Sequence, residues 1–115
     1  MPDFKQGDVV RVPFPYTDRN TRQHRPALVV SNGGIGEDGA LLWVVMITSA
    51  ENRPWANDVR IPDHGKVGLP APSVIRPVKI ATIEASHAER IGQATAATRK
   101  KVMDVVLSLF GTTAG

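Results

Sequence analysis

The residues best suited to chemistry are one arginine and two hydroxyl side chains, placed at the ends of two apolar segments. Arg25 stands before Pro26 and the segment ALVVS, and Thr48 and Ser49 follow ALLWVVMI, the longest apolar run of the chain. If the two segments pair as antiparallel strands, the guanidinium lies beside both hydroxyls. A guanidinium is a planar fork of donors that suits phosphate, and hydroxyls donate to phosphate oxygens. The pairing therefore predicts a site.

Each of these residues also has a plain structural interpretation. Pro26 holds Arg25 in an extended conformation, but local sequence alone favours an exposed arginine at a loop end, since most surface charges are simply solvated. Ser and Thr commonly mark strand ends. Only the expected proximity of Arg25 to Thr48 and Ser49 favours a binding or catalytic role.

Other reactive groups form no recognisable set. The three histidines, His24, His64 and His87, match no zinc-binding spacing, and we interpret them as surface residues. His24 stays a candidate for proton transfer because it adjoins Arg25 and an imidazole titrates near neutrality. The chain has no cysteine. No carboxylates are spaced as a catalytic pair, so we expect neither a metal nor a cofactor.

Composition predicts a single domain over residues 1–115, with 42% hydrophobic and 22% charged residues. No leader sequence or membrane span is evident, and we expect a soluble cytoplasmic protein. The net charge of +3 favours polyanionic or acidic partners. Basic side chains crowd the expected Phe14–His24 loop, which contains Arg19 and Arg22; poor periodicity predicts that this loop is mobile.

The pattern predicts a mainly β protein with one C-terminal helix. Strands are expected at Val9–Val12, Ala27–Ser31, Leu41–Ile47 and Val78–Glu84, with short β pieces near Asp58–Ile61, Gly68–Leu69 and Ser73–Ile75. Prolines between the short pieces suit the corners of a small curved barrel. The helix carries Val102, Val105, Val106 and Leu109 on one face, with Thr95 or Thr98 as N-cap and Gly111 at its end.

The two tryptophans are expected in different environments. Trp43 lies inside the apolar run and is interpreted as a core residue. Trp55 lies in a polar stretch between Arg53 and Asn57, which favours a surface that contacts a ligand or partner.

Taken together, several segments resemble the MazF/PemK family of toxins from bacterial type II toxin–antitoxin modules. They are GDVVRVPFPYTDRNTRQHRPALVVS, VVMITSA, GLPAPSVIRPVKIATIE and RIGQ before the amphipathic helix, in order along nearly the whole chain. The resemblance implies an SH3-like β-barrel, a homodimer and sequence-specific, metal-independent cleavage of single-stranded RNA. It places the catalytic pair on Arg25 and Thr48, with Ser49 auxiliary; His24 departs from the commoner family residue before this arginine.

The resemblance further implies that the products carry a 2′,3′-cyclic phosphate and a free 5′-hydroxyl, and that a cognate antitoxin inhibits the toxin. Operator DNA would be bound only through the antitoxin complex. We expect Arg19, Arg22, Trp55 and Arg76 to contact RNA. Two alternatives stay open: a CcdB-like toxin that binds DNA gyrase without chemistry of its own, and a non-catalytic RNA-binding barrel.

Overall fold

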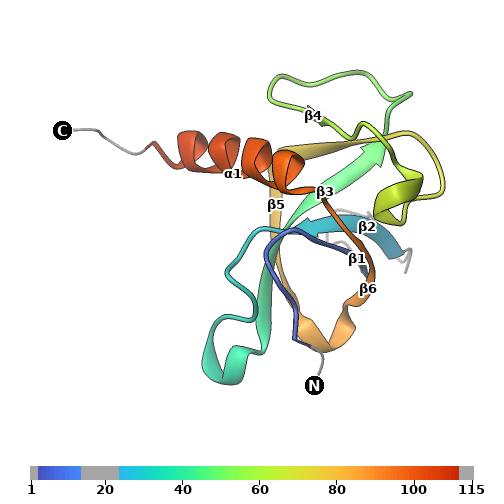
Figure 1. Cartoon of the computed structure of the whole chain (residues 1–115). Coiled ribbons are helices and arrows are strands. Elements are labelled where there is room, and N and C mark those ends of the chain that lie inside the picture. The colour runs from blue at the N-terminus through green and yellow to red at the C-terminus, as the bar shows by residue number, and fades with distance from the viewer. Residues whose placement is uncertain (1–2, 14–23, 112–115) are drawn as a thin grey trace.

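The computed structural model describes residues 3–13 and 24–111, which form a curled antiparallel sheet and one long helix (Figure 1). The strands are β1 (Asp8–Pro13), β2 (His24–Val29), β3 (Leu41–Ser49), β4 (Val59–Arg60), β5 (Ser73–Glu84) and β6 (Glu89–Gln93). Their order in the sheet is β4-β5-β3-β2-β1-β6. Three 3₁₀ turns, η1 (Glu37–Gly39), η2 (Gly65–Val67) and η3 (Ala85–His87), precede α1 (Ala96–Phe110). This is the mainly β fold with a C-terminal helix that the sequence predicts.

Strand β3 lies near the middle of the sheet and is buried on both faces, as its apolar run predicts. Val45 and Ile47 belong to a core cluster that includes Val102 and Val106 of α1. The alternate residues Val44 and Met46 belong to a second cluster, with Val29 and Val12 among its members. Successive side chains of a strand point to opposite faces, so the two clusters lie on the two sides of the sheet. We call them the helix-side core and the opposite core.

Two segments that were expected to be separate strands form one continuous strand, β5. Ser73–Ile75 and Val78–Glu84 are parts of one strand, and Pro77 lies inside it. The register against β3 shifts there, from Ile80 opposite Val45 to Arg76 opposite Met46. A β-bulge of this kind accommodates a proline because the ladder is locally interrupted.

The segment Gly68–Leu69 is not a strand. Gly68 ends η2 in a left-handed conformation, with φ of 89°, a conformation that glycine adopts without steric cost. The strand expected near Asp58–Ile61 is the short β4. Strand β6, which pairs with β1 at the edge of the sheet, was not expected from the sequence.

Helix α1 begins and ends as predicted. The Thr95 side chain accepts a hydrogen bond from the Thr98 backbone N–H, and Gly111 follows the last turn with φ of 71°. Within the described ranges, the structure contains no helix long and apolar enough to cross a membrane.

The prediction that Trp43 is a core residue is wrong, since its side chain is 45% exposed. Trp43 lines a cavity with Ile80, Ala81, Thr82 and Phe110, the last residue of α1. Its ring is therefore covered only at the outer end of the helix, where Phe110 itself is 64% exposed.

Candidate functional site

Arg25 and Thr48 lie on neighbouring antiparallel strands, as expected. Ala27 of β2 pairs with Met46 of β3, and extending that register by two residues places Arg25 opposite Thr48. Both also alternate with members of the opposite core, so they lie on the same face of the sheet. Arg25 is half-buried and Thr48 is 7% exposed.

The two residues line one open pocket of about 240 Å³. Its remaining lining comes from β2, the end of β3 and the turn after it, and the stretch from η2 into the start of β5: Pro26, Ile47, Ser49, Asn52, Leu69, Pro70, Ala71, Pro72 and Ser73. The structure thus brings Arg25, Thr48 and Ser49 to one pocket. The pocket combines a guanidinium with hydroxyl donors, two kinds of group that bind phosphate oxygens.

Two glycines set the position of the pocket's far wall. Gly68 lies directly against the Ile91 carbonyl of β6, and Gly92 lies against the Val67 carbonyl, with no room for a Cβ atom at either position. This close approach fixes the end of η2 against the sheet. The wall formed by Leu69, Pro70 and the residues after them therefore starts from a rigid anchor.

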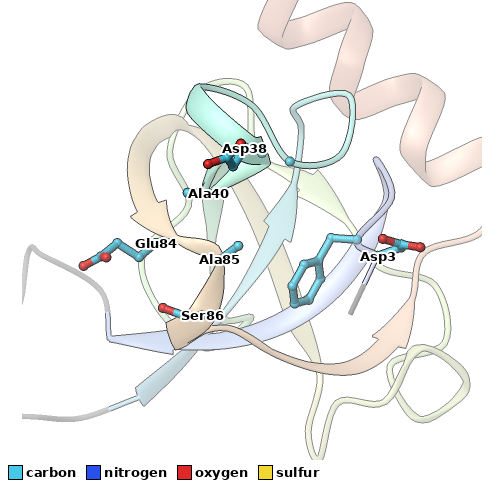
Figure 2. Close-up of a pocket in the computed structure, with 9 residues that line it drawn as sticks. Asp3, Asp38, Ala40, Glu84, Ala85 and Ser86 are labelled. Carbon is cyan, nitrogen blue, oxygen red and sulfur yellow. The ribbon is translucent and has the colours of Figure 1, made fainter. Parts of the chain in front are cut away.

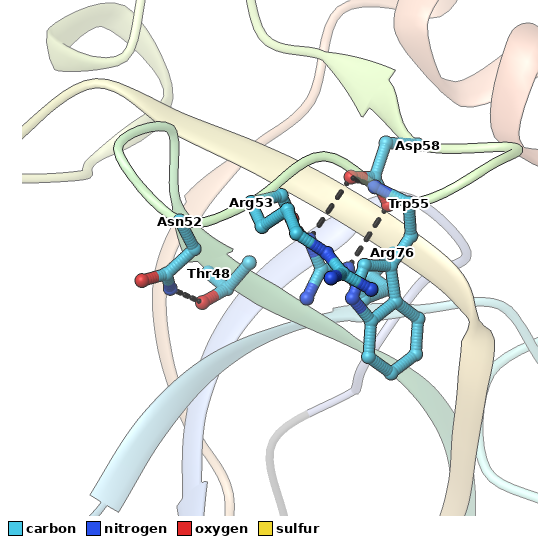
Figure 3. A network of polar contacts seen from close by, with 6 residues as sticks. All are labelled: Thr48, Asn52, Arg53, Trp55, Asp58 and Arg76. Carbon is cyan, nitrogen blue, oxygen red and sulfur yellow. Dashed lines mark hydrogen bonds and ion pairs between the residues drawn. The ribbon is translucent and has the colours of Figure 1, made fainter.

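Asn52 is a pocket residue that the sequence did not single out. Its Nδ2 donates a hydrogen bond of 2.7 Å to Thr48 Oγ1 (Figure 3). The side chain is brought back onto the strand end by a tight turn, in which the Asn52 N–H donates to the Ser49 carbonyl at 3.1 Å. Ser49 Oγ accepts from the Glu51 N–H at 3.1 Å. The only feature of the sequence that could have indicated this contact is a polar residue four positions after Thr48.

A second polar network lies beyond Asn52 on the same loop, around the buried guanidinium of Arg76 (Figure 3). Arg76 Nε and Nη2 each donate to the Asp58 carboxylate at 3.0 Å. Nη2 also donates to the Arg53 carbonyl at 3.0 Å, and the Trp55 N–H donates to Asp58 at 2.9 Å. These bonds tie the loop between β3 and β4 to strand β5.

The carboxyl group of Asp58 shows the electrostatic effect of this network. Burial by itself raises the pKa of Asp58, but the hydrogen bonds from Arg76 and the Trp55 N–H, with the positive charge of Arg76, lower it more. The net result is a pKa below the ordinary aspartate value. Asp58 is therefore the anionic partner of Arg76 and not a general acid.

Arg76 is not placed to bind RNA directly, contrary to expectation. The residue is 5% exposed and its guanidinium is engaged with Asp58 and Arg53. Trp55 is 39% exposed and lies over Arg76, with Cζ of Arg76 4.2 Å from the ring centroid. Arg19 and Arg22, with the rest of the predicted loop up to residue 23, lie outside the described residues.

His24 is exposed at the start of β2, opposite Pro13. It is not among the residues that line the pocket of Arg25. Among residues 3–13 and 24–111, no three His, Asp or Glu side chains gather in a group able to hold a metal ion.

A larger pocket, of about 500 Å³, lies elsewhere, between the N-terminal segment, η1 and η3 (Figure 2). Its lining includes Asp3, Asp38 and Glu84 and, among the residues that the structure describes, no lysine or arginine. Such a lining repels phosphate, so size does not make this pocket the better candidate. We assign the candidate site to the smaller pocket at Arg25 and Thr48.

Comparison with known proteins agrees with this fold. The family model of PemK-like, MazF-like toxins of type II toxin–antitoxin systems matches residues 5–110. The chain belongs to this family. No curated protein sequence matches it significantly.

Solved structures of similar fold include proteins from Deinococcus radiodurans and from mycobacteria. A MazE–MazF structure from Deinococcus radiodurans has a TM-score of 0.76 and 23% identity, covering 96% of this chain and 98% of that chain. An endoribonuclease in complex with its cognate antitoxin, from a mycobacterial species, has a TM-score of 0.71, 21% identity and 96% coverage of both chains. The Mycobacterium tuberculosis toxin MazF-mt6 has a TM-score of 0.61 and 20% identity, covering 88% of this chain and 94% of that chain.

Proposed function

We propose that this toxin is a metal-independent endoribonuclease that cleaves single-stranded RNA at specific sequences. The observation that carries the proposal is that Arg25 and Thr48, on neighbouring strands, line one open pocket. Family membership supports it, as does the description of a mycobacterial structural relative as an endoribonuclease.

In the proposed reaction the nucleophile is the RNA's own 2′-hydroxyl. Its oxygen forms a bond to the adjacent phosphorus while the bond from phosphorus to the 5′-oxygen of the next nucleotide breaks. The 2′-hydroxyl loses its proton to a base or to water, and the departing 5′-oxygen gains one. The products are a 2′,3′-cyclic phosphate and a free 5′-hydroxyl, and the protein has to supply only alignment and charge stabilisation.

The pocket residues suit these two tasks. Arg25 would hold the charge that develops on the nonbridging oxygens of the pentacoordinate phosphorus. Thr48 would donate to one of those oxygens, and Ser49 would assist at the mouth of the pocket. His24 stays a proposal for proton transfer, although it would have to act from the edge of the site.

Trp55 marks the direction in which RNA would continue. Thr48 pairs with Val74, two residues from Arg76 on β5, so Trp55, which covers Arg76, lies beside Thr48 on the same face. A partly exposed indole offers a stacking surface for an unpaired base. Arg19 and Arg22 are retained as proposed backbone contacts.

We further propose a homodimer that a cognate antitoxin inhibits, with operator DNA bound only through the antitoxin complex. Exposed apolar side chains at Trp43, Leu107, Leu109 and Phe110 support association, because their burial between protomers would be favourable. Sedimentation at micromolar concentration should give twice the chain mass of 12.4 kDa; a monomer would contradict the dimer.

The test is incubation of the pure protein with single-stranded RNA in excess EDTA, with Arg25→Ala as the matched control. The proposal expects cleavage by the wild type and not by the variant. Loss of cleavage in EDTA that a divalent ion restores would overturn the metal-free mechanism. RNA that is bound but never cut would favour the non-catalytic barrel, and inhibition of DNA gyrase without RNA cleavage would favour the CcdB-like alternative.

A further inference from the structure

We propose that Asn52 is a positioning residue that orients the hydroxyl group of Thr48 so that its proton faces the scissile phosphate. The inference rests on the proposed function, because it assumes that the pocket of Arg25 and Thr48 holds that phosphate. It assigns a role to a side chain that lines the pocket but carries no charge and no acid–base chemistry.

The hydrogen bond between Asn52 and Thr48 has a defined direction. Asn52 Nδ2 donates to Thr48 Oγ1 at 2.7 Å. An amide nitrogen only donates, whereas a hydroxyl has one proton and two lone pairs. When Asn52 occupies a lone pair of Oγ1, the hydroxyl proton has to point elsewhere. Thr48 lines the open pocket, so a group bound there can accept this proton.

The consequence is a preset donor for phosphate. A hydroxyl that can rotate must lose rotational freedom and give up other partners before it donates to a nonbridging oxygen. Asn52 removes that cost in advance, which is the advantage of a preorganised donor at developing charge. The branched β-carbon of Thr48 also restricts the side-chain torsion that carries the hydroxyl.

The loop that carries Asn52 is anchored on both sides. Before it, the N–H groups of Glu51 and Asn52 donate to the Ser49 hydroxyl and carbonyl, respectively. After it, the Arg53 carbonyl accepts from the buried guanidinium of Arg76. This gives the Arg76 network a function: it fixes the loop from which Asn52 reaches Thr48.

The decisive substitution is Asn52→Asp, which keeps the size of the side chain but leaves it only able to accept. The carboxylate would accept a hydrogen bond from the Thr48 hydroxyl, and Thr48 would no longer donate to phosphate. Asn52→Ala leaves the hydroxyl free to rotate and tests the same contact without added charge. Glu51→Gln is the matched control, because it changes an exposed neighbouring side chain outside the pocket.

The measurement is the single-turnover rate on RNA with a normal scissile phosphate and with sulfur at either nonbridging oxygen, together with KM and the melting temperature. Sulfur is a poor hydrogen-bond acceptor. In the wild type, sulfur at the nonbridging position to which Thr48 donates should therefore slow cleavage more than sulfur at the other position. We expect Asn52→Asp to lose on the order of 10²-fold in rate, with little change in KM, and to lose that difference between the two sulfur positions. Asn52→Ala should lose less, and Glu51→Gln nothing.

A double-mutant cycle with Thr48→Val separates this role from a structural one. If Asn52 acts through Thr48, adding Asn52→Asp to Thr48→Val should slow cleavage little further. Additive losses, or a wild-type rate and sulfur effect in Asn52→Asp, would overturn the inference while leaving the proposed function intact. Wild-type rates in Arg25→Ala and Thr48→Val, or intact RNA with the wild-type protein, would overturn both.

Discussion

The indole ring of Trp55 lies over the guanidinium of Arg76, with Cζ of Arg76 4.2 Å from the ring centroid. The same guanidinium forms an ion pair with Asp58 at 3.0 Å. One buried arginine therefore fixes both an aromatic surface and the loop that delivers Asn52 to Thr48. Residues at the candidate site divide into those placed to touch RNA and those that hold them in place.

Arg25 should dominate the chemical step. We expect Arg25→Ala to lower the cleavage rate by on the order of 10²- to 10³-fold, because it deletes a preorganised donor at developing charge. Arg25→Lys should recover only part of the rate, since an ammonium lacks the planar fork, and Thr48→Ala should lose less than Arg25→Ala. Single-turnover kinetics on a defined RNA would measure this. A folded Arg25→Ala variant with wild-type turnover would make Arg25 a surface residue only.

Trp55 should contribute to RNA affinity by stacking. Trp55→Ala should weaken binding by about 1–3 kcal/mol if one base stacks on the ring, and Trp55→Phe should recover part of that loss. The salt dependence of binding should stay unchanged, because an indole neutralises no phosphate. Fluorescence anisotropy at several salt concentrations would show both effects. Trp43→Phe, at an exposed tryptophan outside the pocket, is the control, and equal loss in both variants would argue against a specific stacking role.

Arg76 should stabilise the folded protein. Arg76→Ala should lower the free energy of unfolding by about 3–5 kcal/mol, because it leaves the buried Asp58 carboxylate without its partner. The surface pair of Lys100 and Asp104, at 2.9 Å and exposed on both sides, supplies the control: Lys100→Ala should cost less than about 1 kcal/mol. Urea unfolding would measure both. An Arg76→Ala protein as stable as Lys100→Ala would contradict the network.

The pKa of Asp58 predicts a matching dependence of stability on pH. The folded-state pKa is lowered from the ordinary value of 3.8, so on acidification the unfolded chain takes up this proton first. The stabilisation is present above that ordinary value and is lost as the pH falls through the folded-state pKa. Asp58→Asn should flatten this part of the unfolding profile between about pH 5 and pH 2. An unchanged acid slope would show that Asp58 does not contribute it.

The sequence was most informative where local pattern and pairing agree. The apolar run of β3 and the extended residue before Pro26 have strong local signals, and their antiparallel pairing puts Arg25 opposite Thr48. Strand β6 was missed because its sequence, ERIGQ, has no apolar alternation and its residues are exposed or half-buried at a sheet edge.

The roles of Asn52, Asp58 and Arg76 depend on tertiary contacts that local pattern does not contain. Asp58 and Arg76 are 18 residues apart, and they meet because β4, which follows Asp58, pairs with β5 through Val59 and Ile75. Trp43 was misplaced for a related reason: the apolar run predicts its strand correctly but not where α1 ceases to cover it.

The most direct test of the central claim is cleavage of an RNA in which a single 2′-hydroxyl is replaced by hydrogen. The cleavage position is first mapped by sequencing the 5′ ends produced by the pure protein, and the deoxy substitution is then made at the nucleotide on the 5′ side of the cut. The proposed mechanism predicts a 2′,3′-cyclic phosphate on the all-ribose product and no cleavage at the substituted position. Continued cleavage at that position, or a product with a 5′-phosphate, would contradict it.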